Sequence, residues 1–253
     1  MPLSYHRLPD TRSHRGPHPA DAELFAPAAW PRLRGAVADL SWLLTRGYAT
    51  PGPLQLVGNR YALEARQRQA VTRSACPDAA LARRRSAEVP AEAAAGGTLL
   101  VDGYNVLTTI ETALGGGVVL LGRDGACRDI AGVHGTWRRV EETVPALRLV
   151  GQFLAARVRP ARCVWYLDAP VSNSGRLRGI IESAATEMGW DWTVEVIPEV
   201  DARLAAATDA TVATADAEIL ERCGRWYALT RELIRGEIPA AHLVDLNVAP
   251  AGG

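Results

Sequence analysis

Residues 98–106, which read TLLVDGYNV, decide the fold of the chain. An apolar run suited to a buried strand ends in an aspartate, and apolar residues at helical spacing follow over 106–114. Similar strand-like runs alternate with helical segments through the rest of the chain, an order typical of βαβ crossovers. We therefore expect an α/β domain over residues 96–253, with a mostly parallel sheet of about four to five strands flanked by helices.

The elements of this domain are expected from the length and spacing of its apolar runs. Strands are expected at 98–101, 118–121, 162–167, 192–197 and 211–214. Helices are expected at 106–114, 145–157, 174–188, 201–207 and from Asp216 onward, and Gly189 is the stop signal of the third.

The chain before this domain has a different character. Residues 1–30 are rich in Pro, His and Arg with little periodicity, which predicts a flexible arm. Residues 31–90 predict a small all-helical module, with helices at about 32–46 and 61–75, a third starting near Asp78, and a turn over 56–60. The second helix carries Arg66 and Arg73 on one face, which we expect to be exposed and to bind phosphates.

Charge is distributed unevenly along the 253 residues. Residues 1–95 hold 13 Arg against 8 Asp plus Glu, whereas residues 96–253 hold 15 Arg against 20 Asp plus Glu. This asymmetry fits a module that binds a polyanion joined to a carboxylate-rich site. It fits equally well two halves that attract one another.

Compartment and membrane association are judged from apolar runs and cysteines. No run reaches the about 18 apolar residues of a membrane span, and the first 30 residues contain no signal-peptide-like stretch, so we expect a cytoplasmic protein without a membrane partner. The four cysteines form no CxxC pair, which argues against a zinc site or a disulfide framework. The sequence leaves open whether the protein forms a homo-oligomer.

Aspartates follow the expected strands, at the edge of a parallel sheet where ligands bind. Asp102 and Asp168 end two strands, Asp216 follows the last one, and Asp201 or Asp209 takes the remaining position. A lone aspartate there is more often a cap or turn residue, but several on successive strands would repel one another unless a cation neutralised them. Mg²⁺ or Mn²⁺, which prefer oxygen ligands, suit such a cluster.

The Asp102-Gly103-Tyr104-Asn105-Val106 motif resembles the opening of the PIN-like nucleases, especially their NYN branch, whose first strand ends in Asp with Asn three residues on. Asp168 and Asp216 resemble later acidic positions of that superfamily. The resemblance covers roughly residues 98–222. It implies a PIN-like fold and Mg²⁺- or Mn²⁺-dependent RNA cleavage, with Asp102, Asp168, Asp216 and Asn105 as catalytic residues, although the superfamily also contains non-catalytic members.

A second resemblance covers nearly the whole chain beyond residue 30. A small basic helical region containing Leu-Val-Gly-Asn-Arg at 56–60, followed by this α/β domain, is similar to a family of prokaryotic proteins known only as domains of unknown function. That resemblance implies the arrangement of the chain and no activity.

Two polar segments are candidates for substrate binding. The stretch 122–139 contains Arg128, His134, Arg138 and Arg139 beside Trp137, and it either grips phosphates and stacks a base or is held by its own Arg–Asp pairs. The second segment leads from Asp168 into a helix and contains four further candidates. An anion would be favoured at that helix start, whereas Ser174 could instead be only the helix cap. The four candidates are Ser172, Asn173, Ser174 and Arg176.

These patterns favour a metal-dependent phosphodiesterase, an endoribonuclease, with RNA as its partner. The main alternative is a non-catalytic RNA-binding or regulatory module with the same fold. A phosphohydrolase of the haloacid-dehalogenase type also begins with an aspartate after its first strand, but it needs a second aspartate two residues later, where this chain has Tyr104.

Overall fold

A four-stranded parallel sheet lies at the centre of the α/β part of the molecule. The computed structural model describes residues 14–130 and 136–249. The sheet has the order β5-β4-β1-β6, and each neighbouring pair is parallel. Its strands are β1 (Thr98–Asp102), β4 (Arg162–Asp168), β5 (Trp192–Ile197) and β6 (Thr211–Ala213). The expected α/β fold with a mostly parallel sheet is therefore confirmed.

Side-chain alternation along β1 gives the sheet two buried faces. Leu99 and Val101 face a core that they share with α7 (Gly103–Leu114), α8 (Thr143–Phe153), α9 (Ser174–Met188) and α12 (Leu229–Glu237). The C-terminal end of α8 continues as a π-helical turn, η2 (Leu154–Val158). Leu100 faces the opposite core with α10 (Val200–Ala205) and α11 (Ala217–Arg222). Because helices cover both faces, ligands reach this sheet most readily at its strand ends.

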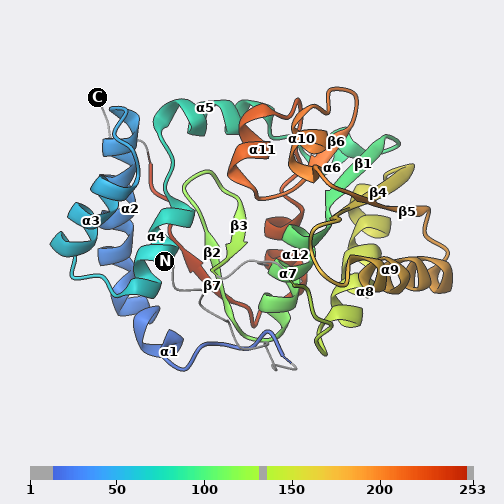
Figure 1. Ribbon diagram of the computed structural model, residues 1–253, viewed down its shortest axis with the longest axis horizontal. Helices are drawn as coiled ribbons and strands as arrows, with labels where there is room; N and C mark the ends of the chain where they lie inside the picture. The colour runs from blue at the N-terminus through green and yellow to red at the C-terminus, as the bar shows by residue number, and fades with distance from the viewer. Residues whose placement is uncertain (1–13, 131–135, 250–253) are drawn as a thin grey trace, which may run out of the picture.

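A second, three-stranded sheet lies beside the first (Figure 1). It contains β2 (Val118–Leu121), which pairs antiparallel with β3 (Cys127–Asp129) and parallel with β7 (His242–Asp245). The expected strand at 118–121 therefore has the right bounds but belongs to a separate sheet. Neither β3 nor β7 was expected, because both are short and half polar and so lack the apolar alternation that identifies a strand.

The N-terminal helical region packs onto this second sheet mainly through α2 (Trp30–Thr45) and α4 (Ala65–Ser74). Its other helices are α1 (Asp21–Leu24), η1 (Pro27–Ala29), α3 (Pro51–Arg60) and α5 (Asp78–Ala87), which packs against α2 and α11, and α6 (Ala91–Ala94) leads into β1. Leu33, Val37 and Leu40 of α2 share one hydrophobic core with Leu120 and Val244 of the sheet. Figure 1 shows the helical region at the left, the small sheet in the middle and the four-stranded sheet at the right.

The turn expected over 56–60 is instead the second half of α3. Gly58 is buried in that helix because the Arg68 side chain lies against it, and a Cβ at Gly58 would come within 2.0 Å of an Arg68 nitrogen. The next helix begins at residue 65 rather than 61, since Glu64 and Gln67 form a capping box there.

The flexible arm expected over residues 1–30 is corrected for its described part, residues 14–30. Arg15 pairs with the buried Glu111 at 3.0 Å, and Arg66 pairs with the buried Asp21 at 2.5 Å. Buried acids give this Pro- and His-rich segment specific partners, which its lack of periodicity did not reveal.

None of the helices within residues 14–130 and 136–249 combines the length and the apolar character required to cross a bilayer.

Candidate functional site

The candidate site lies at the edge of the four-stranded sheet where its parallel strands end. Asp102, the last residue of β1, is 6% exposed there. Gly103 makes this packing feasible, because a Cβ at that position would lie 2.7 Å from the Tyr166 carbonyl oxygen. Burial, together with the charges of Asp216 and Asp201, raises the pKa of the Asp102 carboxyl to about 7.

The turn after β6 holds this carboxylate. Thr214 donates its hydroxyl to Oδ2 of Asp102 at 2.7 Å and accepts the Asp216 amide at 3.0 Å. Asn105 accepts the Ala215 amide at 2.8 Å through Oδ1. Asn105, expected to orient a carboxylate or a phosphate, therefore orients the turn that carries Asp216.

Asp216 itself begins α11 as its N-cap. Its Oδ1 accepts the amides of Glu218 and Ile219, at 2.8 Å and 3.2 Å. A cap of this kind satisfies helix-end donors and stabilises the helix. Asp216 thus has a structural role in addition to its place at the strand ends.

Asp168 and Asp201 occupy the β4 side of the same edge. Asp168 ends β4, and Asp201 lies in the first turn of α10, which contacts both β1 and β4. Burial raises the pKa of Asp168 and the charge of Asp201 adds to the rise, while a hydrogen bond from the Val200 amide opposes it. Burial also raises the pKa of Asp201, with contributions from Asp216 and Glu218.

Besides burial, the negative charges of neighbouring aspartates raise the pKa values of Asp102, Asp168 and Asp201. Within residues 14–130 and 136–249, no arginine or histidine is among the main groups that shift the pKa of Asp102, Asp168 or Asp201. Concentrated negative charge of this kind marks a functional-site candidate, because a purely structural carboxylate is usually paired.

The two candidates for the remaining acidic position are separated by the sheet. Asp201 belongs to the edge described above. Asp209 is exposed and precedes Thr211, the first residue of β6, so it lies at the opposite edge, where the parallel strands begin. The expectation that Asp209 is a metal ligand is therefore corrected.

Sequence reasoning missed two residues of this edge, Thr214 and Glu218. Thr214 is the hydrogen-bond donor to Asp102, and Glu218 adds negative charge beside Asp201. Both flank Asp216, so a search of the residues around each strand-end aspartate, rather than of the aspartates alone, would have found them.

A divalent ion was tested against this donor set. Carboxylate oxygens are the ligands that Mg²⁺ and Mn²⁺ prefer, and the buried Asp102 carboxylate, whose main charged neighbours among the described residues are other aspartates, is a suitable ligand for such a cation. In the part of the chain that the structure describes, however, no three His, Cys, Asp or Glu side chains stand close enough together to hold an ion. Binding would therefore require the aspartate side chains to move toward one another.

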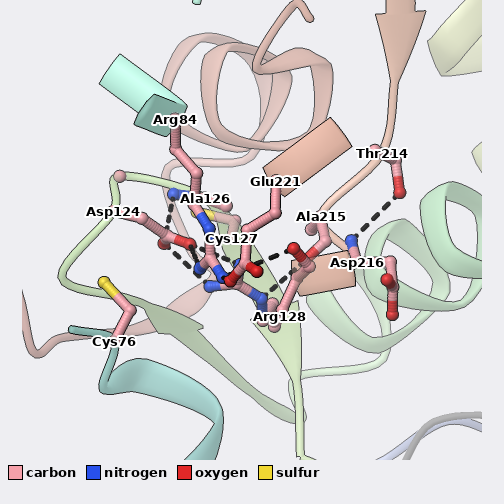
Figure 2. Close-up of polar contacts among 12 residues, drawn as sticks. Cys76, Arg84, Asp124, Ala126, Cys127, Arg128, Thr214, Ala215, Asp216 and Glu221 are labelled. Atoms are coloured by element: carbon pink, nitrogen blue, oxygen red, sulfur yellow. Dashed lines mark hydrogen bonds and ion pairs between the residues drawn. The ribbon is translucent and has the colours of Figure 1, made fainter. Parts of the chain in front are cut away.

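Three of the six arginines expected to bind phosphate are occupied by protein groups. Arg128 is buried and donates to Asp124 and to the Ala215 carbonyl, as Figure 2 shows. Arg66 pairs with Asp21, and Arg73 contacts Asp129 at 3.3 Å. For the 123–128 hairpin the structure therefore shows Arg–Asp pairing rather than phosphate binding, and the exposed basic face expected on α4 is wrong at these two positions.

The remaining basic candidates gather beside the end of β4. The Trp137 amide donates to the Ser172 carbonyl at 3.2 Å, and the Asn173 side-chain amide donates to the Trp137 carbonyl at 3.0 Å. These bonds bring the segment that carries Arg138 and Arg139 against the loop that follows Asp168. Arg138 is half-buried and Arg139 and Arg176 are exposed, whereas His134 lies outside the described residues.

Ser174 is neither a free anion ligand nor the helix cap. It is buried, its hydroxyl contacts the Asp168 carbonyl at 2.7 Å and also the Val171 carbonyl, and it accepts the Tyr104 hydroxyl at 3.0 Å. The N-cap position of α9 belongs to Asn173, in the left-handed conformation at φ 72° that asparagine tolerates. Ser174 therefore fixes the loop rather than a ligand.

Comparisons with known proteins add two family matches and one relative. The family described as "Domain of unknown function (DUF5616)" matches residues 91–232, and "Protein of unknown function (DUF434)" matches residues 32–86. The chain is 28% identical over 189 residues to "Uncharacterized protein MJ0935" of Methanocaldococcus jannaschii, covering 75% of this chain and 89% of that protein. No solved structure matches the chain. The two matched ranges meet between α5 and α6.

Proposed function

The chain belongs to the family described as "Domain of unknown function (DUF5616)", and because that description names no activity, we propose from the site itself that the protein is a divalent-metal-dependent phosphodiesterase that cleaves RNA. One observation carries the proposal. Asp102, Asp168, Asp201 and Asp216 lie at the strand ends of one parallel sheet, and the first three have raised pKa values with no cation among the main causes in the described residues.

The aspartates would hold the ion, and neighbouring residues would hold the aspartates. Thr214 keeps Oδ2 of Asp102 in place through its hydroxyl, and Asn105 holds the turn through the Ala215 amide. When bound there, Mg²⁺ or Mn²⁺ would supply an activated water and would neutralise charge on the phosphate. The resemblance to PIN-like and NYN-type nucleases points to three of these aspartates, Asp102, Asp168 and Asp216, and it adds to the proposal without replacing the electrostatic argument.

RNA is proposed as the substrate because three arginines lie on the segments that flank the loop after Asp168. Arg138, Arg139 and Arg176 form no ion pair with a residue that the structure describes, and two of them are exposed. Unpaired arginines next to an acidic centre can bind the flanking phosphates of a strand whose scissile phosphate meets the metal. We place the protein in the cytoplasm, and a homo-oligomer is compatible with the proposal.

A non-catalytic RNA-binding or regulatory module is the second candidate. The observation that favours it is that the described acids do not converge into a ready ion site. Such a module would bind RNA with or without Mn²⁺ and leave it intact.

The test is cleavage of a mixed RNA pool by the purified full-length protein in Mn²⁺, compared with the same reaction in chelator. Asp102→Asn should abolish cleavage, because it removes a charge while keeping a side chain of nearly the same size. Asp209→Asn is the matched control, since it makes the same substitution at the opposite edge of the sheet and should leave the rate unchanged. Cleavage by Asp102→Asn at the wild-type rate, or wild-type binding of RNA without cleavage, would reject the proposal.

A further inference from the structure

A buried polar network joins the helical region to the acidic site. At its centre is Asp124, in the turn between β2 and β3, whose side chain is 1% exposed. It accepts Arg84 Nη1 of α5 at 2.6 Å and both terminal nitrogens of Arg128 of β3, at 2.8 Å and 2.6 Å. Figure 2 shows the two arginines converging on this carboxylate.

Arg128 also reaches out of this network toward the site. Its Nε donates to the Ala215 carbonyl at 2.6 Å. The amide of the same Ala215 donates to Asn105, so the residue is held at its carbonyl by Arg128 and at its amide by Asn105. Ala215 lies between Thr214, which binds Asp102, and Asp216. By holding the Ala215 carbonyl, the Arg128 guanidinium therefore restrains the two residues on either side of it, Thr214 and Asp216.

The electrostatics of this network favour an orienting role. Two arginines hold the pKa of the buried Asp124 carboxyl at about 2 against the rise that its burial causes. A buried ion pair contributes little net stability, because the desolvation of its charges offsets their attraction. A buried ion pair is better explained by the single geometry that it imposes on its surroundings. Arg128 imposes such a geometry on Ala215, because its third donor, Nε, binds the Ala215 carbonyl.

We propose that Arg128 is a positioning residue that fixes the Thr214–Asp216 turn and, through it, the arrangement of the acidic site; as a statement about metal binding, this rests on the function proposed above. Arg84 extends the same connection to the helical region, since it binds Asp124 from α5 and also pairs with Glu221 of α11 at 2.5 Å. The helical region is then a structural part of the site rather than a separate RNA-binding attachment.

The chain offers a matched control for this proposal in Arg123. It is also buried and lies in the same β2–β3 turn, but it pairs with Asp78 at 2.5 Å and donates to the Cys76 carbonyl at 2.6 Å, both in the helical region. Arg123→Lys should therefore disturb a buried arginine without touching Ala215. Arg128→Lys keeps the charge but loses the fork of donors that reaches Asp124 and Ala215 together.

Two measurements on the full-length protein test the proposal. The first is hydrogen–deuterium exchange of the Ala215 and Asp216 amides, which needs no metal. It should accelerate about tenfold or more in Arg128→Lys and stay unchanged in Arg123→Lys. The second is Mn²⁺ affinity, measured by electron paramagnetic resonance of the free ion. It should fall about 10- to 100-fold in Arg128→Lys, as is typical when a residue that orients metal ligands is lost.

The outcomes separate this proposal from the proposed function. Unchanged exchange at both amides in Arg128→Lys, or equal acceleration in Arg123→Lys, overturns the positioning role. A wild-type protein that neither binds Mn²⁺ nor cleaves RNA rejects the proposed function, while the exchange rates still decide whether Arg128 holds the turn. If Arg128→Lys does not fold, Asp124→Asn replaces it, because this variant keeps the Arg128 guanidinium but weakens its anchor, and the same two amides should exchange faster.

Discussion

Two buried aspartates, about equally hidden from solvent, behave in opposite ways. Asp124 is 2% exposed and Asp102 is 6% exposed. The arginines around Asp124 hold its pKa at about 2, whereas burial and the charges of Asp216 and Asp201 raise the pKa of Asp102 to about 7. Burial therefore does not decide the state of a carboxylate, because its partners do.

The comparison separates a structural acid, Asp124, from Asp102, the acid that we propose binds metal. Asp124 lies where the helical region, the small sheet and α11 meet, and its charge is fully used in holding them together. Asp102 lies at the edge where the strands end, and among the described residues the main groups that favour its ionised form are hydrogen-bond donors, Thr214 and the Asn105 amide. A buried carboxylate beside other carboxylates lowers the stability of the fold. Selection tolerates this cost mainly where a ligand binds the charge.

The largest effect is expected from removing the structural acid. Asp124→Ala leaves two buried arginines with Glu221 as their remaining acidic partner, and the loss of one member of a buried ion network typically costs about 3 to 5 kcal/mol. Urea denaturation near pH 7 measures this loss. The exposed Asp209→Ala should stay within about 0.5 kcal/mol of wild type. Equal stability of the two variants would show that Asp124 is not the centre of the network.

The contribution of Asp102 to stability should depend on pH with the opposite sign to that of Asp124, because the pKa of Asp102 is raised and that of Asp124 is lowered. The pKa of Asp102 is raised from 3.8 to about 7 in the folded state, so folding favours its protonated form. This contribution is fully present below about pH 4 and is lost as the pH rises through about 7. Its size is roughly 4 kcal/mol for a shift of this order.

Asp102→Asn isolates that contribution. Wild type, treated with chelator, should lose stability relative to this variant between pH 5 and pH 8, a window above the titration of Asp124. Thermal melts of both proteins across the window measure the difference. A constant difference between wild type and Asp102→Asn would mean that Asp102 is already ionised at pH 5, and the contrast with Asp124 would disappear.

Added metal should reverse the loss that ionised Asp102 causes. An ion that binds only the folded protein adds about 2.7 kcal/mol of stability at 100 times its dissociation constant. Melting of chelator-treated protein at pH 7.5, with and without Mn²⁺, measures this gain, which should be absent in Asp102→Asn and retained in Asp209→Asn. Superimposed wild-type melts would argue against the ion and leave the excess negative charge without a ligand.

Elements whose apolar pattern is complete could be predicted from the sequence with good bounds. The strands at 118–121 and 192–197 and the helix at 174–188 have the bounds that were expected. Short elements without such a pattern, β3 and β7, were missed. Pattern also does not state which sheet a strand joins, since β2 reads like the other strands but pairs with β3 and β7.

The strand-end aspartates were predictable for a similar reason, because a parallel sheet brings its strand ends to one edge. The partners of the arginines were predictable only in part. Arg128 pairs with Asp124, four residues earlier, as the alternative of internal Arg–Asp pairs allowed, but its bond to the Ala215 carbonyl, 87 residues away, does not follow from local spacing. The uneven charge fitted both a module that binds a polyanion and two halves that attract one another, and the bond from Arg84 of the helical region to Asp124 is a contact of the second kind.

The smallest expected effect on stability concerns Asp216, which combines the two kinds of acid in one side chain. Its Oδ1 caps α11, as a structural acid would, while its charge acts on Asp102 and Asp201. Asparagine caps a helix about as well as aspartate, so Asp216→Asn should change stability by only a few tenths of a kcal/mol, whereas Asp216→Ala should lose about 1 kcal/mol.

Activity should divide the same two variants differently. Both lack the charge, so both should lose Mn²⁺-dependent RNA cleavage, even though only Asp216→Ala loses the cap. Thermal melts and cleavage assays on the two proteins, side by side, give the four values needed. Wild-type cleavage by Asp216→Asn would mean that only the cap matters, and Asp216 would then belong with Asp124 as a structural acid. Loss of cleavage at unchanged stability would instead assign its charge to the site, since nothing else distinguishes that variant from wild type.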